Sequence, residues 1–141
     1  MIIKQLSVFL ENKTGRLNEV ATLLGENGVN MSAFSLADNS DFGILRVIVS
    51  DIDKAQQVLR NSNFATTITD VLCLRVSNNP GALSKALNIL ADASIFIDYM
   101  YAFSQQDSAN VIIRVRNLKE AMNVLTKHQF ELVAADTLYE F

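Results

Sequence analysis

Apolar and polar residues alternate along the first residues of the chain. Leu6, Val8 and Leu10 fall on one side of an extended backbone, and the polar residues Gln5 and Ser7 fall on the other. A period of two with one polar side is typical of a half-buried β-strand. The pattern therefore predicts that the chain opens with a strand.

A helical period replaces this alternation after the first strand. Leu17, Val20, Ala21 and Leu24 fall on one face of a helix at their spacing. Gly28 follows, and a glycine is suited to end a helix in a left-handed turn because it has no Cβ atom. The segment therefore predicts a helix that ends just before Gly28.

Two apolar runs come next, on either side of the polar segment Asp38-Asn39-Ser40-Asp41. Apolar runs around a short polar turn predict a β-hairpin, here with strands at 30–37 and 43–49. Asp51 is suited to cap a second helix, and a closing strand is predicted at 66–71. The whole segment has the order strand-helix-strand-strand-helix-strand.

The same pattern occurs again in the second half of the chain. Asn12 and Gly15 recur as Asn78 and Gly81 at one constant spacing, and the apolar helix faces recur with them. Chance periodicity in an apolar-rich chain would not align glycines, caps and helix faces together. We therefore interpret the repeat as a duplication.

The second copy predicts the same elements with small differences. Asn79 is the expected N-cap of its first helix, and Pro80 is the expected first helical residue. Ser94 replaces Gly28, so this helix is expected to end differently. The remaining predicted elements are strands at 96–103 and 110–116 around a turn at 105–108, a helix capped by Asn117, and a closing strand at 132–139.

This order of elements is the split-βαβ, ferredoxin-like arrangement. The predicted fold class is α+β: a ferredoxin-like βαββαβ unit repeated twice, with antiparallel sheets and helices on one face. We predict a first domain at 1–70 and a second at 71–141, with almost no linker between them. The sheet face without helices is expected to be open. It would carry Ile44, Ile112 and Cys73, and its apolar members suggest an assembly surface.

Composition and charge narrow the classes of function. Half of the 141 residues are hydrophobic, 19% are charged, and the net charge is −3. The chain has no cluster of lysine and arginine, and its central strands lack the aromatic residues that stack on RNA bases, so we expect no nucleic-acid partner. We find no run of about 20 apolar residues and no signal-peptide pattern. We therefore expect no membrane partner and a cytoplasmic location.

Reactive residues are few. His128 is the single histidine and Cys73 the single cysteine, and the sequence implies no partner for either. The acidic residues fall at caps and turns, and no Cys/His spacing typical of a zinc site occurs. We therefore expect no enzyme activity, no metal site and no cofactor.

The loop between the first strand and the first helix offers chemistry of another kind. It runs Glu11-Asn12-Lys13-Thr14-Gly15-Arg16-Leu17 and recurs as Ser77-Asn78-Asn79-Pro80-Gly81-Ala82-Leu83. The N–H groups and the dipole at a helix start favour an anion such as a carboxylate. An asparagine amide can bind a carboxylate or an ammonium group. From these residues the loop is either an amino-acid-binding loop or a plain capping turn.

The same residues resemble the ACT domain family. The usual family signature is a strand, Asn/Asp-x-Pro-Gly-x-Leu, a helix and Gly-x-Asn-Ile. The chain carries these two motifs first at 12–17 and 28–31, and again at 78–83 and 94–97. Thr14 stands for the usual proline in the first copy, and Ser94 and Phe96 stand for the usual glycine and asparagine in the second. The resemblance covers the whole chain twice and is that of a stand-alone tandem ACT protein.

This resemblance implies a regulatory role. ACT domains usually bind an amino acid at the interface between two such domains and often control an enzyme of amino-acid metabolism. It therefore implies a free amino acid and a partner enzyme as binding partners, and it favours a homodimer. The alternative is a regulatory or assembly subunit that acts through open sheet faces without a small ligand.

The resemblance also carries over a set of candidate ligand-binding residues. These are Asn12, Thr14, Gly15, Arg16, Asn30, Met31, Ser32, Asn78, Asn79, Pro80, Gly81, Ala82, Phe96 and Ile97. We favour a site that combines the loop 78–82 of one unit with residues 30–32 of the other. The reverse pairing stays open.

Overall fold

The structure is a computed structural model and describes residues 1–38 and 41–139. The chain divides into two compact units, and the division falls between Thr69 and Asp70. We call Lys4–Thr69 the N-terminal unit and Asp70–Leu138 the C-terminal unit. Met1–Ile3 belong with the C-terminal unit, and Tyr139 belongs with the N-terminal unit. The expected domains at 1–70 and 71–141 stay a prediction.

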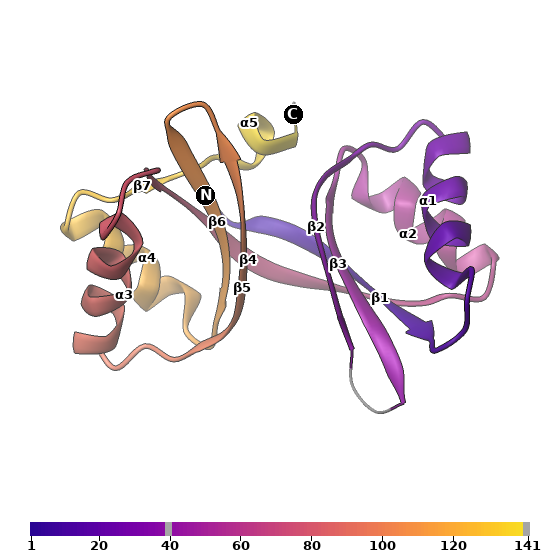
Figure 1. Cartoon of the computed structure of the whole chain (residues 1–141), viewed down its shortest axis with the longest axis horizontal. Helices are drawn as coiled ribbons and strands as arrows, with labels where there is room; N and C mark the ends of the chain where they lie inside the picture. Colours follow the sequence, from indigo (N-terminus) through magenta and orange to yellow (C-terminus); the bar gives the residue numbers. More distant parts are fainter. Residues whose placement is uncertain (39–40, 140–141) are drawn as a thin grey trace. The chain divides into compact units, whose positions relative to one another are not determined.

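The N-terminal unit follows the predicted order of elements. Its elements are β1 (Ile3–Glu11), α1 (Arg16–Glu26), β2 (Met31–Asp38), β3 (Phe42–Val49), α2 (Ile52–Asn61) and the first part of β4 (Ala65–Ser77). The strand order is β2-β3-β1-β4. Figure 1 shows α1 and α2 together on one side of this sheet. Apolar side chains from these helices and from the sheet, Leu24, Leu59 and Leu6 among them, form the core.

The C-terminal unit repeats the arrangement. It contains the rest of β4, then α3 (Ala82–Asp92), β5 (Ile97–Gln105), β6 (Ser108–Val115), α4 (Leu118–Lys127), β7 (Glu131–Leu132) and α5 (Ala135–Tyr139). The strand order is β5-β6-β4, with β7 beside β4. The predicted fold class, a ferredoxin-like βαββαβ unit repeated twice, is confirmed. The predicted run of strand through the domain boundary is also confirmed, because β4 is one strand of 13 residues.

The two hairpins match their predicted strands closely. In the C-terminal unit β5 and β6 are antiparallel and pair from Ile97 with Val115 to Gln105 with Ser108. The turn therefore consists of Gln106 and Asp107, and the other two predicted turn residues belong to the strands. In the N-terminal unit β2 and β3 pair up to Asp38 with Gly43. The predicted turn at 38–41 lies partly outside the described residues, since 39 and 40 are not described.

Both first helices begin with a turn that needs glycine. Gly15 and Gly81 are the N-caps, with φ of 94° and 88°, and neither makes a side-chain cap hydrogen bond. Ala82 N–H donates to Asn79 O, which closes a turn with Pro80 and Gly81 at its centre. This is the type II turn, in which proline is favoured second and glycine third. The prediction of Asn79 as N-cap and Pro80 as first helical residue is therefore wrong, because both residues build the turn instead.

The first helices of the two units also end alike. Gly28 follows α1 with φ of 72°, as predicted, and Val29 N–H donates to Leu24 O. Ser94 follows α3 with φ of 58°, and Ile95 N–H donates to Leu90 O. The prediction that Ser94 ends its helix differently is therefore wrong. The closing hydrogen bond and the burial of the residue after the turn hold Ser94 in a conformation that its Cβ atom disfavours.

The caps predicted for the second helices are confirmed. The side chain of Asp51 accepts a hydrogen bond from Lys54 N–H at the start of α2. Asn117 accepts from Glu120 N–H at the start of α4, and its amide group donates to the Glu120 carboxylate. The second pair resembles a capping box, except that the Glu120 carboxylate accepts from the Asn117 side-chain amide and not from its backbone N–H.

The closing strand predicted at 132–139 is wrong over most of its length. β7 ends at Leu132, and the chain forms the short helix α5. Leu138 N–H donates to Ala134 O, which closes a helical turn, and the Leu138 side chain is fully buried. Ala134 and Ala135 favour this helix over a strand, and burial of Leu138 stabilises it.

The face expected to be open is partly buried in the C-terminal unit. Cys73 and Ile112 pair across β4 and β6, and both are fully buried. The prediction of an open face is therefore wrong at these two positions. Val133 N–H donates to Cys73 O, and Figure 1 shows α5 on the side of the sheet away from α3 and α4. The sequence pattern predicted a strand at 132–139 and therefore no segment on this side of the sheet.

Candidate functional site

The strand register of the N-terminal unit brings three chain segments together. Gly43 of β3 pairs with Leu10 of β1 on one side and with Asp38 of β2 on the other. The loop that follows β1 leads directly into α1. The end of β2 and the loop that leads from β1 into α1 therefore lie on either side of the first residues of β3.

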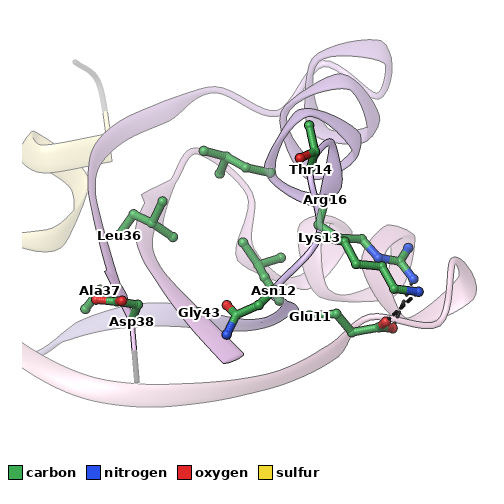
Figure 2. Close-up of a pocket in the computed structure, with 11 residues that line it drawn as sticks. Glu11, Asn12, Lys13, Thr14, Arg16, Leu36, Ala37, Asp38 and Gly43 are labelled. Atoms are coloured by element: carbon green, nitrogen blue, oxygen red, sulfur yellow. Dashed lines mark hydrogen bonds and ion pairs between the residues drawn. The ribbon is translucent and has the colours of Figure 1, made fainter. Parts of the chain in front are cut away.

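A hollow of about 350 Å³ lies between these segments. Figure 2 shows the loop from Glu11 to Arg16 on one side of it and Leu36, Ala37 and Asp38 of β2 on the other. We call it the polar hollow. Its lining residues are Leu10, Glu11, Asn12, Lys13, Thr14, Arg16, Leu17, Leu36, Ala37, Asp38 and Gly43. The structure thus brings the predicted residues Asn12, Thr14 and Arg16 together around one hollow, with the predicted Gly15 between them in sequence.

The backbone at the start of α1 can attract an anion. Gly15 caps the helix without a side-chain hydrogen bond, so no side chain of the cap competes for the N–H groups that follow Arg16, whose own N–H donates to Lys13 O. These groups carry the positive end of the helix dipole. The Asn12 side chain has no hydrogen-bond partner among the described residues. A carboxylate in the polar hollow can therefore accept from backbone N–H groups and from an amide.

Charged side chains surround the mouth of the polar hollow. The Glu11 carboxylate lies 3.1 Å from Lys13 Nζ and 3.0 Å from Arg16 Nη2. The hydrogen bond from Lys13 and the charge of Arg16 lower the pKa of Glu11 below its ordinary value. Arg16 Nη1 also lies 3.1 Å from Glu19 Oε2. Both cations therefore already have carboxylate partners, and a bound anion would have to share them.

An apolar groove adjoins the polar hollow. It has a volume of about 350 Å³ and runs between α1 and β2. Its lining residues are Leu17, Ala21, Met31, Phe34, Leu36 and Leu45. Leu17 and Leu36 line both the groove and the polar hollow. The two spaces therefore meet at these two side chains.

The matching loop of the C-terminal unit has different neighbours. Asn78 N–H donates to Asp107 O, at 2.8 Å, which ties the loop to the turn between β5 and β6. A hollow of about 290 Å³ lies on another side of this loop, where Ala82 and Lys85 of α3 meet Arg75 of β4 and Glu131 of β7. Arg75 Nη1 lies 3.0 Å from Glu131 Oε1. The Arg75 guanidinium at this hollow is therefore already paired with a carboxylate, as Lys13 and Arg16 are at the polar hollow.

The other predicted site residues lie at varied places. The backbone of Asn30 exchanges hydrogen bonds with Ser50, and Ser32 is half-buried in β2. Met31 lines the apolar groove and does not line the polar hollow. Phe96 is 60% exposed, with the Arg116 guanidinium 4.7 Å from its ring centre. Ile97 packs against the core of the C-terminal unit.

The two residues considered for catalysis line neither hollow. Burial raises the pKa of the Cys73 thiol to about 12, so the reactive thiolate is scarce at neutral pH. His128 caps the end of α4, where its Nδ1 lies 2.9 Å from Val124 O. Across residues 1–38 and 41–139, no three His, Cys, Asp or Glu side chains are close enough to hold a metal ion.

Sequence reasoning missed the β2 wall of the site. Leu36, Asp38 and Gly43 were not among the candidates, although they line the polar hollow. The hairpin pattern contained a usable signal, because a short turn fixes which residues of the two strands pair. Residues at the end of β2, just before this turn, lie beside the start of β3, next to the end of β1. Leu17 was assigned to the buried helix face, yet it is 40% exposed.

The repeated units define the chain as a tandem ferredoxin-like α+β protein with a hollow at the glycine-capped start of its first helix. More specifically, the chain belongs to the ACT domain pair family, whose sequence profile matches residues 1–141. The resemblance on which the sequence prediction depended is therefore confirmed. No curated protein sequence matches the chain significantly.

Solved structures agree with this assignment. The crystal structure of protein BT0572 from Bacteroides thetaiotaomicron is 48% identical in sequence, has a TM-score of 0.96, and is covered over 98% of its length by 100% of this chain. The regulatory subunit of aspartate kinase from Thermus thermophilus has a TM-score of 0.64 at 12% identity, with 90% of this chain and 94% of that one covered. The same subunit from Thermus flavus has a TM-score of 0.63 at 14% identity, with the same coverage. At this identity the two kinase subunits share the fold with the chain.

No helix among the described residues is both long enough and apolar enough to cross a membrane.

Proposed function

We propose that the chain is a non-catalytic regulatory protein that binds a free amino acid in the polar hollow of its N-terminal unit. The observation that carries the proposal is the hollow itself, which lies between a glycine-capped helix start and the end of β2. Membership of the ACT domain pair family supports it. The sequence favoured the loop 78–82. We propose the loop at Asn12 and Thr14 instead, because this loop borders the polar hollow, whereas Asn78 is hydrogen-bonded to the turn between β5 and β6.

The chemistry of the polar hollow suits both charged groups of an amino acid. The ligand carboxylate would accept hydrogen bonds from the first N–H groups of α1 and from the Asn12 amide. The ligand ammonium group would lie toward Asp38, whose carboxylate is on the opposite wall. Separation of the two charges across the hollow selects a zwitterion over a simple anion.

The proposal includes a partner enzyme of amino-acid metabolism. Two solved structures with this fold are regulatory subunits of aspartate kinase. Binding would stabilise the arrangement of α1 and β2 that holds the ligand, and a partner that contacts this arrangement would respond. We extend the proposal to a cytoplasmic homodimer, in keeping with a single buried thiol and with exposed apolar residues on β2.

One observation favours the alternative of an assembly subunit without a small ligand. Phe34 is 62% exposed and Met100, at the matching position of the second copy, is 42% exposed. Large apolar side chains at matching places on β2 and β5 suit a protein interface. In that case the chain would bind a partner enzyme and show no response to amino acids.

Thermal unfolding against a panel of free amino acids tests the proposal. A ligand at about 100 times its dissociation constant stabilises the folded chain by about 2.7 kcal/mol, which raises the Tm of a chain of this size by several degrees. We expect one or a few amino acids to raise the Tm. A flat response across the panel would contradict amino-acid binding and favour the assembly subunit.

Matched variants then assign the response to one loop. We expect Asn12→Ala to remove most of the Tm rise, because it deletes an amide in the polar hollow. The control is Asn78→Ala, which makes the same change at the matching loop of the C-terminal unit and should leave the rise intact. A response lost only in Asn78→Ala would move the site to the loop that the sequence favoured. A response kept in both variants would place the ligand elsewhere.

A further inference from the structure

The apolar groove has a lining without polar side chains. All six side chains that line it are apolar, and four of them are exposed: Ala21, Leu17 (40%), Leu36 (53%) and Phe34 (62%). Apolar side chains left in water in one concave place are a source of binding free energy for an apolar group. The groove therefore has the chemistry of a pocket for a hydrophobic side chain.

The groove and the polar hollow are continuous. Leu17 at the start of α1 and Leu36 near the end of β2 line both spaces. A ligand whose charged groups lie in the polar hollow can therefore extend a side chain past these two residues into the groove. The polar hollow suits the charged groups of an amino acid, and the groove suits an apolar side chain. Together the two spaces can hold an amino acid with an apolar side chain.

We propose that the ligand is an amino acid with a large apolar side chain, of the leucine, methionine or phenylalanine type, and that the apolar groove selects it. This inference rests on the proposed function. A polar side chain would lose its hydrogen bonds to water in the groove and find no partner there. A small side chain such as that of alanine would leave the groove unfilled, and each missing methylene costs about ten-fold or more in affinity.

The C-terminal unit supplies an internal contrast. Leu87 of α3 stands where the N-terminal unit has Ala21, and it is half-buried, whereas Ala21 is exposed. Leu83, which matches Leu17, packs against the core of its unit. A leucine at the Ala21 position would therefore put a larger side chain into the groove. The variant Ala21→Leu copies this difference into the groove.

Titration calorimetry of the full chain tests the inference. The panel is leucine, methionine and phenylalanine against alanine, serine and lysine. We expect binding of the large apolar group at least ten-fold tighter than binding of the others. Ala21→Leu should weaken that binding by ten-fold or more and leave any weak binding of alanine unchanged, because the polar hollow is untouched. The control Thr22→Leu places the same side chain on the next exposed residue of α1, outside the groove, and should bind as the parent chain does.

The outcomes separate this inference from the proposed function. Binding of only serine, alanine or lysine would overturn the inference and leave amino-acid binding in place. Tight binding of leucine that Ala21→Leu does not weaken would also overturn it, since the side chain would then lie elsewhere. No binding by any amino acid would overturn the proposed function and the inference together. A change of oligomeric state in Ala21→Leu without ligand, seen by light scattering, would assign the groove to a second copy of the chain and overturn the inference.

Discussion

The starts of α1 and α3 have the same backbone but different surroundings. Gly15 and Gly81 have nearly equal φ and ψ, and both lie within a turn closed by a hydrogen bond from the next residue. The first start lies beside a hollow against β2, whereas the second is tied by Asn78 to the turn between β5 and β6. The duplicated motif therefore specifies how the helix begins. The neighbouring strands and turns decide what a ligand could contact there.

The largest expected effect concerns the cores of the two units. Leu24 of α1 and Leu90 of α3 occupy matching positions, and both are fully buried. We expect Leu24→Ala and Leu90→Ala each to lower the free energy of unfolding by about 2–5 kcal/mol, because each leaves a cavity. Urea unfolding followed by circular dichroism measures both. If the two variants lose clearly different free energies of unfolding, one core relaxes around the cavity more easily than the other. The two units would then differ in packing as well as in the surroundings of their loops.

The ends of the first helices give a test with a smaller expected change in stability, and the two substitutions are expected to change it in opposite directions. Gly28 and Ser94 both have positive φ after matching helices. We expect Gly28→Ser to lower the free energy of unfolding by about 1–2 kcal/mol, since it puts a Cβ atom into a left-handed conformation. Ser94→Gly should raise it by a smaller amount, because relief of strain is offset by the greater entropy of unfolded glycine. Equal signs for the two substitutions would contradict this account of the turns.

Helix caps sharpen the comparison at the second helices. Asp51 accepts one backbone hydrogen bond at the start of α2, and Asn117 takes part in a reciprocal pair with Glu120 at the start of α4. We expect Asp51→Ala and Asn117→Ala each to lower the free energy of unfolding by about 1 kcal/mol. Thermal unfolding can measure this. Asn117→Ser, which keeps an acceptor at the cap without placing a second carboxylate beside Glu120, should retain most of the stability that the alanine variant loses.

The smallest effect at neutral pH concerns the pair Ser7 and Cys73, which occupy matching positions in the two copies. Burial raises the pKa of the Cys73 thiol from 9.0 to about 12. A raised pKa favours the protonated thiol in the folded chain. Its contribution to stability is therefore complete below about pH 9 and is lost as the pH rises toward 12. We expect Cys73→Ser, which copies Ser7, to show a weaker fall in urea stability between about pH 8 and pH 10.5 than the parent chain. An unchanged pH slope would show that Cys73 is accessible to water.

Local sequence signals predicted most of the fold. The alternation around Leu6 and Leu72, the helical spacing and the caps at Asp51 and Asn117 each act over a few residues, and the structure keeps all of them. The signals failed where distant contacts decide. Ser94 adopts a conformation that its residue type disfavours because the turn is closed by a buried neighbour. The segment after Leu132 becomes a helix because Leu138 is buried.

The site was predictable in its loop and not in its walls. The glycine and asparagine of the loop are a local signal, and Asn12, Thr14 and Arg16 all line the polar hollow. Leu36 and Asp38 join them only through the pairing of β1 and β2 with β3. Sequence spacing shows that the 38–41 turn makes a hairpin, but the position of that hairpin beside β1 depends on the register of the sheet.

The continuous strand β4 imposes a rule on how the gene can vary in length. Thr66 is buried in the N-terminal unit and Leu72 in the C-terminal unit, on one uninterrupted run of strand. Side chains on a strand change sides at every residue. A single codon inserted or lost between these two positions would turn the inward side chains of one unit outward, whereas a pair of codons would preserve them. Length changes in this stretch are therefore expected to accumulate by twos among natural relatives, while loops can vary one residue at a time.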